Sequence, residues 1–142
     1  MSQQSHILQA PRTTDQREIN QWQIGVYQSL KNVIRGRTET LGSTPQELLS
    51  FPVVANKTYL GEVLIVARQK GGGGGSPNNA FGSVALVKID TGGVDVTNIF
   101  EQADEAWADS YTVTGGRFFV NVAGLVDRIV SWFGLVRLQV VS

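Results

Sequence analysis

The segment "RIVSWFGLVRLQVV", residues 128–141, alternates between two kinds of side chain with a period of two, which is the period of a β-strand. One set of alternating positions is Val130, Trp132, Gly134, Val136, Leu138 and Val140. The other set mixes Ser131, Arg137 and Gln139 with Phe133 and Leu135. The pattern predicts a strand that is buried on one face and half exposed on the other, within a sheet that covers a hydrophobic core.

Several segments upstream also favour strands. "TYLGEVLIVARQ" and "FGSVALVKID" are rich in β-branched residues, and "VDVTNIF" predicts a weaker third strand. "DSYTVTGGRFFVNVAG" predicts two strands joined at Gly115-Gly116, a strong signal for a two-residue hairpin. We therefore expect a mainly β fold, with an antiparallel, jelly-roll-like β-sandwich head domain over residues 51–142.

Five consecutive glycines, residues 71–75, interrupt this run of strands. A phosphate-binding loop would need Gly-Lys-Ser/Thr at the start of a helix, but here "SPNN" and a strand follow. A linker between domains is disfavoured because neither side forms a complete domain alone. The pattern predicts a mobile hairpin tip or inter-strand loop, and Gly73 and Asn78 are candidates for an exposed binding loop.

The N-terminal part has a different pattern. Residues 1–13 are polar and predict an extended arm, and steps of three and four between apolar residues predict an amphipathic helix from about Asp15 to about Arg35, ending at Gly36. The expected anchor or oligomer interface on this helix consists of Ile19, Trp22, Val26, Leu30 and Val33. The residues leave open whether this stripe is covered by another copy of the chain, by the head domain or by a capsid protein.

A second short helical turn is expected just after that helix. Thr44, Pro45 and Glu47 have the spacing of a capping box, which predicts a turn of helix that ends before Pro52. Residues 1–50 would then form an N-terminal arm and helical anchor or stalk.

Charge and composition exclude several classes of protein. Lys plus Arg and Asp plus Glu both total 12, so a broad basic face for nucleic acid is not expected. The sequence has no cysteine, and its longest apolar runs are too short to cross a bilayer. The N-terminus lacks the apolar core of a signal peptide, so we expect synthesis in a cytoplasm, with no membrane partner and no cofactor.

No catalytic cluster or metal site is evident. His6 is the only histidine and lies in the polar arm, and the acidic stretch "EQADEAWAD" lacks the spacing of a calcium loop. A glycosidase-like carboxylate pair in that stretch is the alternative to a solvated acidic loop. Trp107, within the stretch, either packs under its loop or forms an exposed aromatic platform for a ligand. We expect that the chain is not an enzyme.

The C-terminal quarter is similar to a pattern found at the C-termini of tailed-bacteriophage virion proteins. In that pattern two V-x-V strands joined by a tight turn end in Gly, and a final strand with an aromatic residue alternates valines. Here the pattern is carried by Val113, Gly115, Val120, Val122, Gly124, Trp132, Val136 and Val140. The Leu125–Arg128 loop is more apolar and more charged than is usual in the family.

The resemblance implies a trimeric β-sandwich in the virion, preceded by a segment that fixes it there. On that basis we expect a homotrimeric knob that decorates or cements the capsid and docks on the major capsid protein or another virion protein. The alternative is a tail-fibre or tail-tip protein that binds a receptor, such as a host-surface glycan, through exposed loops.

Overall fold

The computed structural model describes residues 15–21 and 32–142. Its contacts divide the chain into two units, Met1–Val33 and Ile34–Ser142, and each is treated by itself. In the first unit, residues 16–21 form a short helix. The Asp15 carboxylate accepts a hydrogen bond from the backbone N–H of Arg17 at 2.8 Å, so Asp15 caps this helix.

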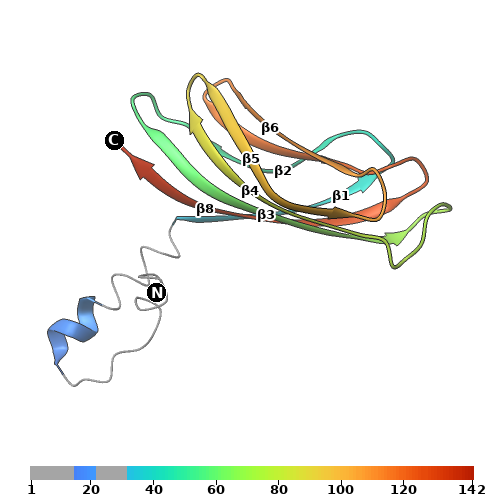
Figure 1. Ribbon diagram of the computed structural model, residues 1–142, viewed down its shortest axis with the longest axis horizontal. Coiled ribbons are helices and arrows are strands. Elements are labelled where there is room, and N and C mark those ends of the chain that lie inside the picture. The colour runs from blue at the N-terminus through green and yellow to red at the C-terminus, as the bar shows by residue number, and fades with distance from the viewer. Residues whose placement is uncertain (1–14, 22–31) are drawn as a thin grey trace. The chain divides into compact units, whose positions relative to one another are not determined.

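The second unit is built from β-strands (Figure 1). They are β1 (Val33–Leu41), β2 (Gln46–Pro52), β3 (Thr58–Gly71), β4 (Ala80–Asp90), β5 (Gly93–Ala103), β6 (Ala108–Thr114), β7 (Arg117–Ala123) and β8 (Ile129–Val141). One sheet has the order β1-β8-β3-β4-β5 and the other has the order β2-β7-β6. The expected mainly β fold with two antiparallel sheets is confirmed.

The order of the outer strands explains the jelly-roll-like character. The chain crosses between the two sheets from β1 to β2, from β2 to β3, from β5 to β6 and from β7 to β8. β3, β4 and β5 instead follow one another as a meander in the larger sheet. The predicted turn at Gly115-Gly116 joins β6 to β7, and both glycines have positive φ, at 58° and 73°.

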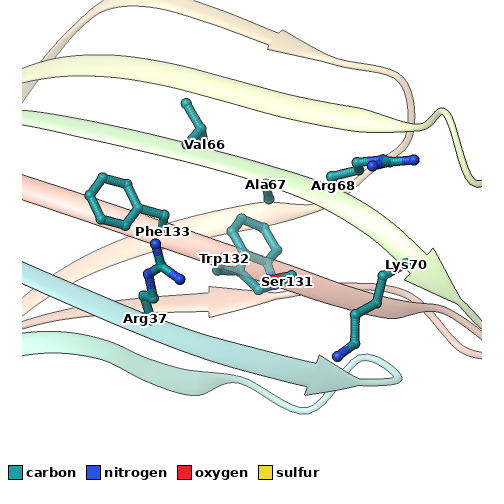
Figure 2. A pocket seen from close by; sticks show the side chains of 8 residues that line it. All are labelled: Arg37, Val66, Ala67, Arg68, Lys70, Ser131, Trp132 and Phe133. Carbon is teal, nitrogen blue, oxygen red and sulfur yellow. The ribbon is translucent and has the colours of Figure 1, made fainter.

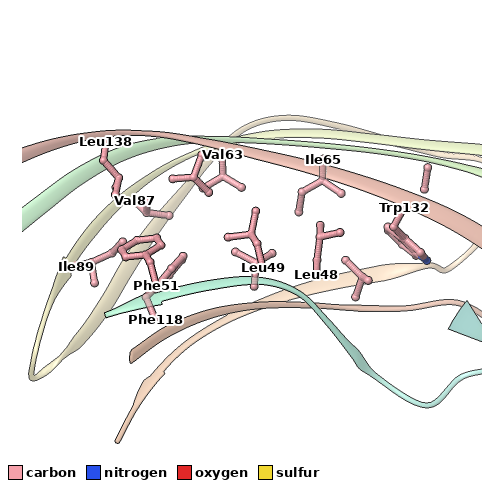
Figure 3. Close-up of a cluster of buried hydrophobic side chains, with 14 of the residues drawn as sticks. Leu48, Leu49, Phe51, Val63, Ile65, Val87, Ile89, Phe118, Trp132 and Leu138 are labelled. Carbon is pink, nitrogen blue, oxygen red and sulfur yellow. The ribbon is translucent and has the colours of Figure 1, made fainter. Parts of the chain in front are cut away.

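The core lies between the two sheets (Figure 3). β3 alternates strictly, so that its odd-numbered residues are buried from Tyr59 to Gln69 and its even-numbered residues face outward. Phe118 and Val120 of β7 are fully buried on the facing sheet. Each fully buried side chain of this size contributes roughly 1.5–3 kcal/mol relative to an exposed position, so the alternation largely determines which face of each strand turns inward.

Two helical predictions were wrong. The helix was expected to reach Arg35, but β1 already begins at Val33. Residues 22–31 are outside the described part of the chain. The helical turn expected at the capping-box sequence is β2, which pairs with β7. Residues 34–50 therefore contribute strands to the two sheets of the β-sandwich.

Gly36 was predicted to end a helix, but it lies inside β1. A Cβ on this residue would be 2.0 Å from the carbonyl oxygen of Leu48 and 2.8 Å from the Cβ of Leu49. The glycine therefore allows the backbones of β1 and β2 to approach closely, which is a tertiary requirement that resembles a helix stop in sequence.

Candidate functional site

Three loops contact one another at one end of the β-sandwich, and we call this end the glycine-loop end. It comprises the β3–β4 loop (residues 72–79), the β5–β6 loop (residues 104–107) and the β7–β8 loop (residues 124–128). Gly74 N–H donates to the carbonyl of Asp127 at 2.9 Å, and Gly42 N–H donates to the carbonyl of Arg128 at 3.2 Å. The first bond ties the glycine run to a loop more than fifty positions away, and the second ties the β1–β2 connection to the start of β8.

The glycine run is a hairpin tip, as predicted, but it is closely packed on one side. A Cβ on Gly74 would be 2.0 Å from Nη1 of Arg128, and one on Gly75 would be 2.4 Å from Oε1 of Gln69. Gln69 is buried and donates through Nε2 to the carbonyls of Gly71, at 3.1 Å, and Gly74. Both atoms end flexible side chains that can shift, so the stricter requirements for glycine are at Gly72 and Gly75, whose φ values are 102° and 66°; a Cβ on Gly72 would also be 2.3 Å from the carbonyl oxygen of Asp127.

An ion pair holds the other two loops. The Arg128 guanidinium donates to Glu105 from Nη2 to Oε2 at 2.6 Å and from Nε to Oε1 at 3.0 Å, a bidentate contact. The Arg128 guanidinium, with a hydrogen bond from Asn79, holds the pKa of the Glu105 carboxyl below its ordinary value, although desolvation opposes this. Glu105 in turn raises the pKa of Arg128.

This ion pair gives the stability of the β-sandwich a defined pH dependence. Because the pKa of Glu105 is lower in the folded state, the unfolded state binds more protons as the pH falls, and stability decreases. The contribution is complete above the ordinary carboxyl pKa and is lost as the pH falls through the folded value. Urea midpoints measured between about pH 6 and about pH 3 should therefore fall less for Glu105→Gln than for the parent chain.

The matched control for this prediction is Glu47→Gln, because Glu47 is exposed and makes no ion pair within the described residues. Its pH dependence should follow that of the parent chain. Equal slopes for Glu105→Gln and the parent chain would show that the Glu105–Arg128 pair does not contribute.

The predicted loop residues lie in two different environments. Gly73 and Asn78 are exposed at the tip of the β3–β4 loop, beside the end of β3. Trp107 was also proposed for an exposed loop, but it is 4% exposed and its ring centroid lies 6.0 Å from that of Trp132, so the burial alternative holds. Val126, which the sequence reasoning missed, is 65% exposed at this end. The Leu125–Arg128 loop is more apolar than is usual, and this sequence feature could have identified Val126 as a surface residue.

The residues expected on the helical stripe are not brought together in the described part. Ile19 is half-buried on the short helix, and Val33 is the first residue of β1. Trp22, Val26 and Leu30 lie outside the described residues. Their role as an anchor or oligomer interface stays a prediction.

The acidic stretch makes separate structural contacts. Asp104 accepts a hydrogen bond from Ala80 N–H at 2.9 Å, and Asp109 accepts from the hydroxyls of Ser83 and Tyr111 at 3.2 and 2.8 Å. Burial, followed by the bond to Asp109, raises the pKa of Tyr111. Across the described residues, no group of three or more His, Cys, Asp or Glu side chains could hold a metal ion.

A second surface feature is an open hollow of about 480 Å³ on the outward face of the larger sheet (Figure 2). Ser131 and Phe133 of β8 lie between Arg37 of β1 and Val66, Arg68 and Lys70 of β3, all lining the hollow. The Arg37 guanidinium lies 5.5 Å from the centroid of the Phe133 ring, in cation–π contact.

The electrostatics of the hollow favour a negatively charged group. Lys70 forms an ion pair with Glu39, and Nε of Arg68 donates to the carbonyl of Pro77 at 3.2 Å. Arg37 and Arg68 therefore supply two positive charges for which the described residues offer no carboxylate partner. The half-buried Phe133 ring and the Ser131 hydroxyl also line the hollow.

Comparisons with known proteins give weak matches. No known family and no curated protein matches the sequence. Among solved structures, the chain is similar to the tailspike protein of Acinetobacter phage vB_ApiP_P1, at 12% identity and a TM-score of 0.43 over 77% of this chain and 22% of that one. It is also similar to the tailspike protein of Acinetobacter baumannii phage AM24, at 8% identity and a TM-score of 0.43 over 77% and 26% of the two chains.

The chain thus spans about a quarter of the length of those tailspike proteins. A TM-score below 0.5 does not establish a common fold. The expectation that the chain is not an enzyme is wrong as an exclusion, because the similar structures are those of tailspike proteins.

No helix within residues 15–21 or 32–142 has the length and apolar character needed to span a membrane.

Proposed function

We propose that this chain is a tail component of a tailed-phage virion that contacts the host surface through the glycine-loop end. The observation that carries the proposal is the loop cluster, where exposed Gly73, Asn78 and Val126 lie on loops joined by the Gly74–Asp127 backbone hydrogen bond and the Arg128–Glu105 pair. Loops positioned by a rigid scaffold commonly carry binding function.

The C-terminal pattern supports the assignment to a virion. Its elements correspond to strands β6 and β7, the Gly115-Gly116 hairpin between them, and β8 with buried Trp132. Capsid decoration is the second candidate, and it is favoured by the same C-terminal pattern. In both cases we propose a homotrimer located in the virion, with another virion protein as its docking partner.

Immunogold electron microscopy on the phage particles that carry this chain would test the location. Label at the tail is the expected result, in few copies per particle. Label spread over the capsid in many copies would favour decoration, and particles without label would contradict a virion role.

Adsorption of the fluorescently labelled full chain to host cells would test the binding surface. Asn78→Ala combined with Val126→Asp should reduce adsorption by about tenfold, because two exposed contacts at the centre of the loop cluster are lost. Val54→Asp is the matched control, because Val54 is 49% exposed in the β2–β3 connection, at the opposite end of β3. Equal losses for the two variants would contradict binding through the glycine-loop end.

A further inference from the structure

Two arginines at the hollow on the larger sheet are held in place by neutral groups (Figure 2). The Arg37 guanidinium lies over the Phe133 ring, and Nε of Arg68 donates to the carbonyl of Pro77. An aromatic ring or a backbone carbonyl orients a guanidinium but leaves its positive charge uncompensated. Since a guanidinium has several N–H donors, each arginine keeps donors that can bind a ligand.

The carboxylates near the hollow do not neutralise these arginines. The three strands that line the hollow carry two carboxylates, Glu39 of β1 and Glu62 of β3. Glu39 forms an ion pair with Lys70, and Glu62 lies opposite Arg137, outside the lining. Asp104, in the nearby β5–β6 loop, accepts a hydrogen bond from a backbone N–H and forms no ion pair in the described part of the chain. The hollow therefore keeps two positive charges.

The other lining groups indicate which kind of anion fits. The hollow has a volume of about 480 Å³, within the range of small-molecule sites. The exposed Ser131 hydroxyl lies on β8, between the strands that carry Arg37 and Arg68, and Val66 adds an apolar surface. An acidic sugar residue combines the matching features: a carboxylate or sulfate, several hydroxyls, and an apolar face of C–H groups. Planar guanidinium groups bind such oxyanions through paired hydrogen bonds.

The position of the hollow also favours a polymer as its ligand. The hollow opens on the outward face of the sheet, and Arg68 is bonded to Pro77 of the β3–β4 loop, so the hollow adjoins the glycine-loop end. An extended chain that contacts the loops can continue into it. A nucleic acid is disfavoured because its phosphates require a broad basic surface, whereas this chain has a net charge of zero.

We propose that this hollow binds an acidic sugar residue of a polysaccharide. Arg37 and Arg68 hold its carboxylate or sulfate, and Ser131 bonds to one of its hydroxyls. This is a second binding surface beside the glycine-loop end, and it defines the chemical class of its ligand. The inference rests on the proposed function only for the source of the polysaccharide, because the binding itself is a property of the hollow.

Isothermal titration calorimetry of the full chain with purified polysaccharides would test this inference. Polygalacturonate carries carboxylates, dextran sulfate carries sulfates, and dextran is the uncharged probe. Low salt should be used because ions screen contacts between exposed charges. We expect an acidic polymer to bind and dextran not to bind, and the tighter acidic polymer identifies the anion. Equal binding of dextran, or binding of none of the three, would overturn the proposal.

Removal of the two arginines tests the site. Arg37→Gln combined with Arg68→Gln should raise the dissociation constant by about tenfold or more, because hydrogen bonds to a charged group are lost. Arg117→Gln combined with Arg137→Gln is the matched control, since it removes the same charge from exposed residues outside the hollow. Equal losses for the two variants would indicate diffuse attraction and contradict a defined site.

An added carboxylate offers a second test at an exposed position. Ser131→Asp places a negative charge between the strands of the two arginines, so it should compete with the ligand and raise the dissociation constant by about tenfold. Ser131→Asn is the matched control, of similar size but without charge, and should retain most of the binding. Circular dichroism would confirm that each variant is folded. Unchanged binding by folded Ser131→Asp would overturn the placement of the anion.

The remaining outcomes separate this inference from the proposed function. Polyglutamate that binds as tightly as the acidic polysaccharides would assign the hollow to acidic proteins and overturn the inference. Binding that requires Arg37 and Arg68, with host adsorption unaffected by Asn78→Ala and Val126→Asp, would support the hollow and contradict the glycine-loop end. Adsorption that is lost with that loop variant, without any polysaccharide binding, would contradict the hollow alone.

Discussion

Replacing Trp132 by alanine should lower the free energy of unfolding by about 3–5 kcal/mol, the largest effect that we expect from a single core change. Trp132 is 1% exposed, and its ring lies 5.4 Å from that of Phe81 and 6.0 Å from that of Trp107. Removing it would leave a cavity that these two rings cannot fill, and urea unfolding followed by circular dichroism would measure the loss.

The same substitution also removes a buried hydrogen bond. Trp132 Nε1 donates to Oγ1 of Thr40 at 2.9 Å, and Thr40 is fully buried.

Thr40→Val should therefore lower the free energy of unfolding by roughly 1–3 kcal/mol, because it leaves the indole N–H without its partner. Ser131→Ala is the control on the outward face of the same strand and should change stability by less than about 0.5 kcal/mol. A loss for Trp132→Ala as small as that of this control would contradict the packing described.

Gly36→Ala should destabilise the β-sandwich by about 3 kcal/mol, at the upper end of the range for overpacking. The added methyl group would meet the backbone carbonyl of Leu48 at 2.0 Å, and a backbone atom cannot move aside as a flexible side chain can. The contact can be relieved only by separating β1 from β2, which lie in different sheets.

The control for this prediction is a second glycine within a strand. Gly82 of β4 has no atom within 4 Å of an added Cβ, so Gly82→Ala should be neutral or stabilising by up to about 1 kcal/mol. Thermal or urea unfolding of the two variants side by side would measure the difference. Equal midpoints would mean that β1 and β2 do not approach as closely as described.

Local pattern was sufficient for the strands from β3 onward. The alternation in β8 and the paired glycines at 115 and 116 depend on nearest neighbours in the sequence, and both appear in the structure where expected. The weak segment "VDVTNIF" also forms a strand, β5, despite having little cover on either face.

The same local rules failed between residues 33 and 52. The capping-box spacing at Thr44 and Glu47 and the glycine at 36 have the form of helix signals. Pairing of β1 with β8 and of β2 with β7, whose partners lie more than sixty positions away, outweighs these weak preferences, because propensity differs by less than about 1 kcal/mol per residue for most residue types.

The candidate surfaces depended even more on the tertiary structure. Leu135, Leu64, Val84 and Phe100 lie side by side on the larger sheet, although each comes from a different strand. The loop cluster likewise joins Gly74, Glu105 and Arg128. Neither set of residues lies within one short stretch of the sequence.

From its sequence alone, this chain is a β-rich protein in which most strands bury one face, because the period of two is a property of the strand itself. Which strands become neighbours, and therefore which outward side chains form a common surface, is decided only when the two sheets pack. Charge illustrates the difference: the acidic run from Thr91 to Gly116 is visible in the sequence, but only the fold places Asp95 and Glu101 on the edge strand β5 and Asp109 on β6 of the other sheet.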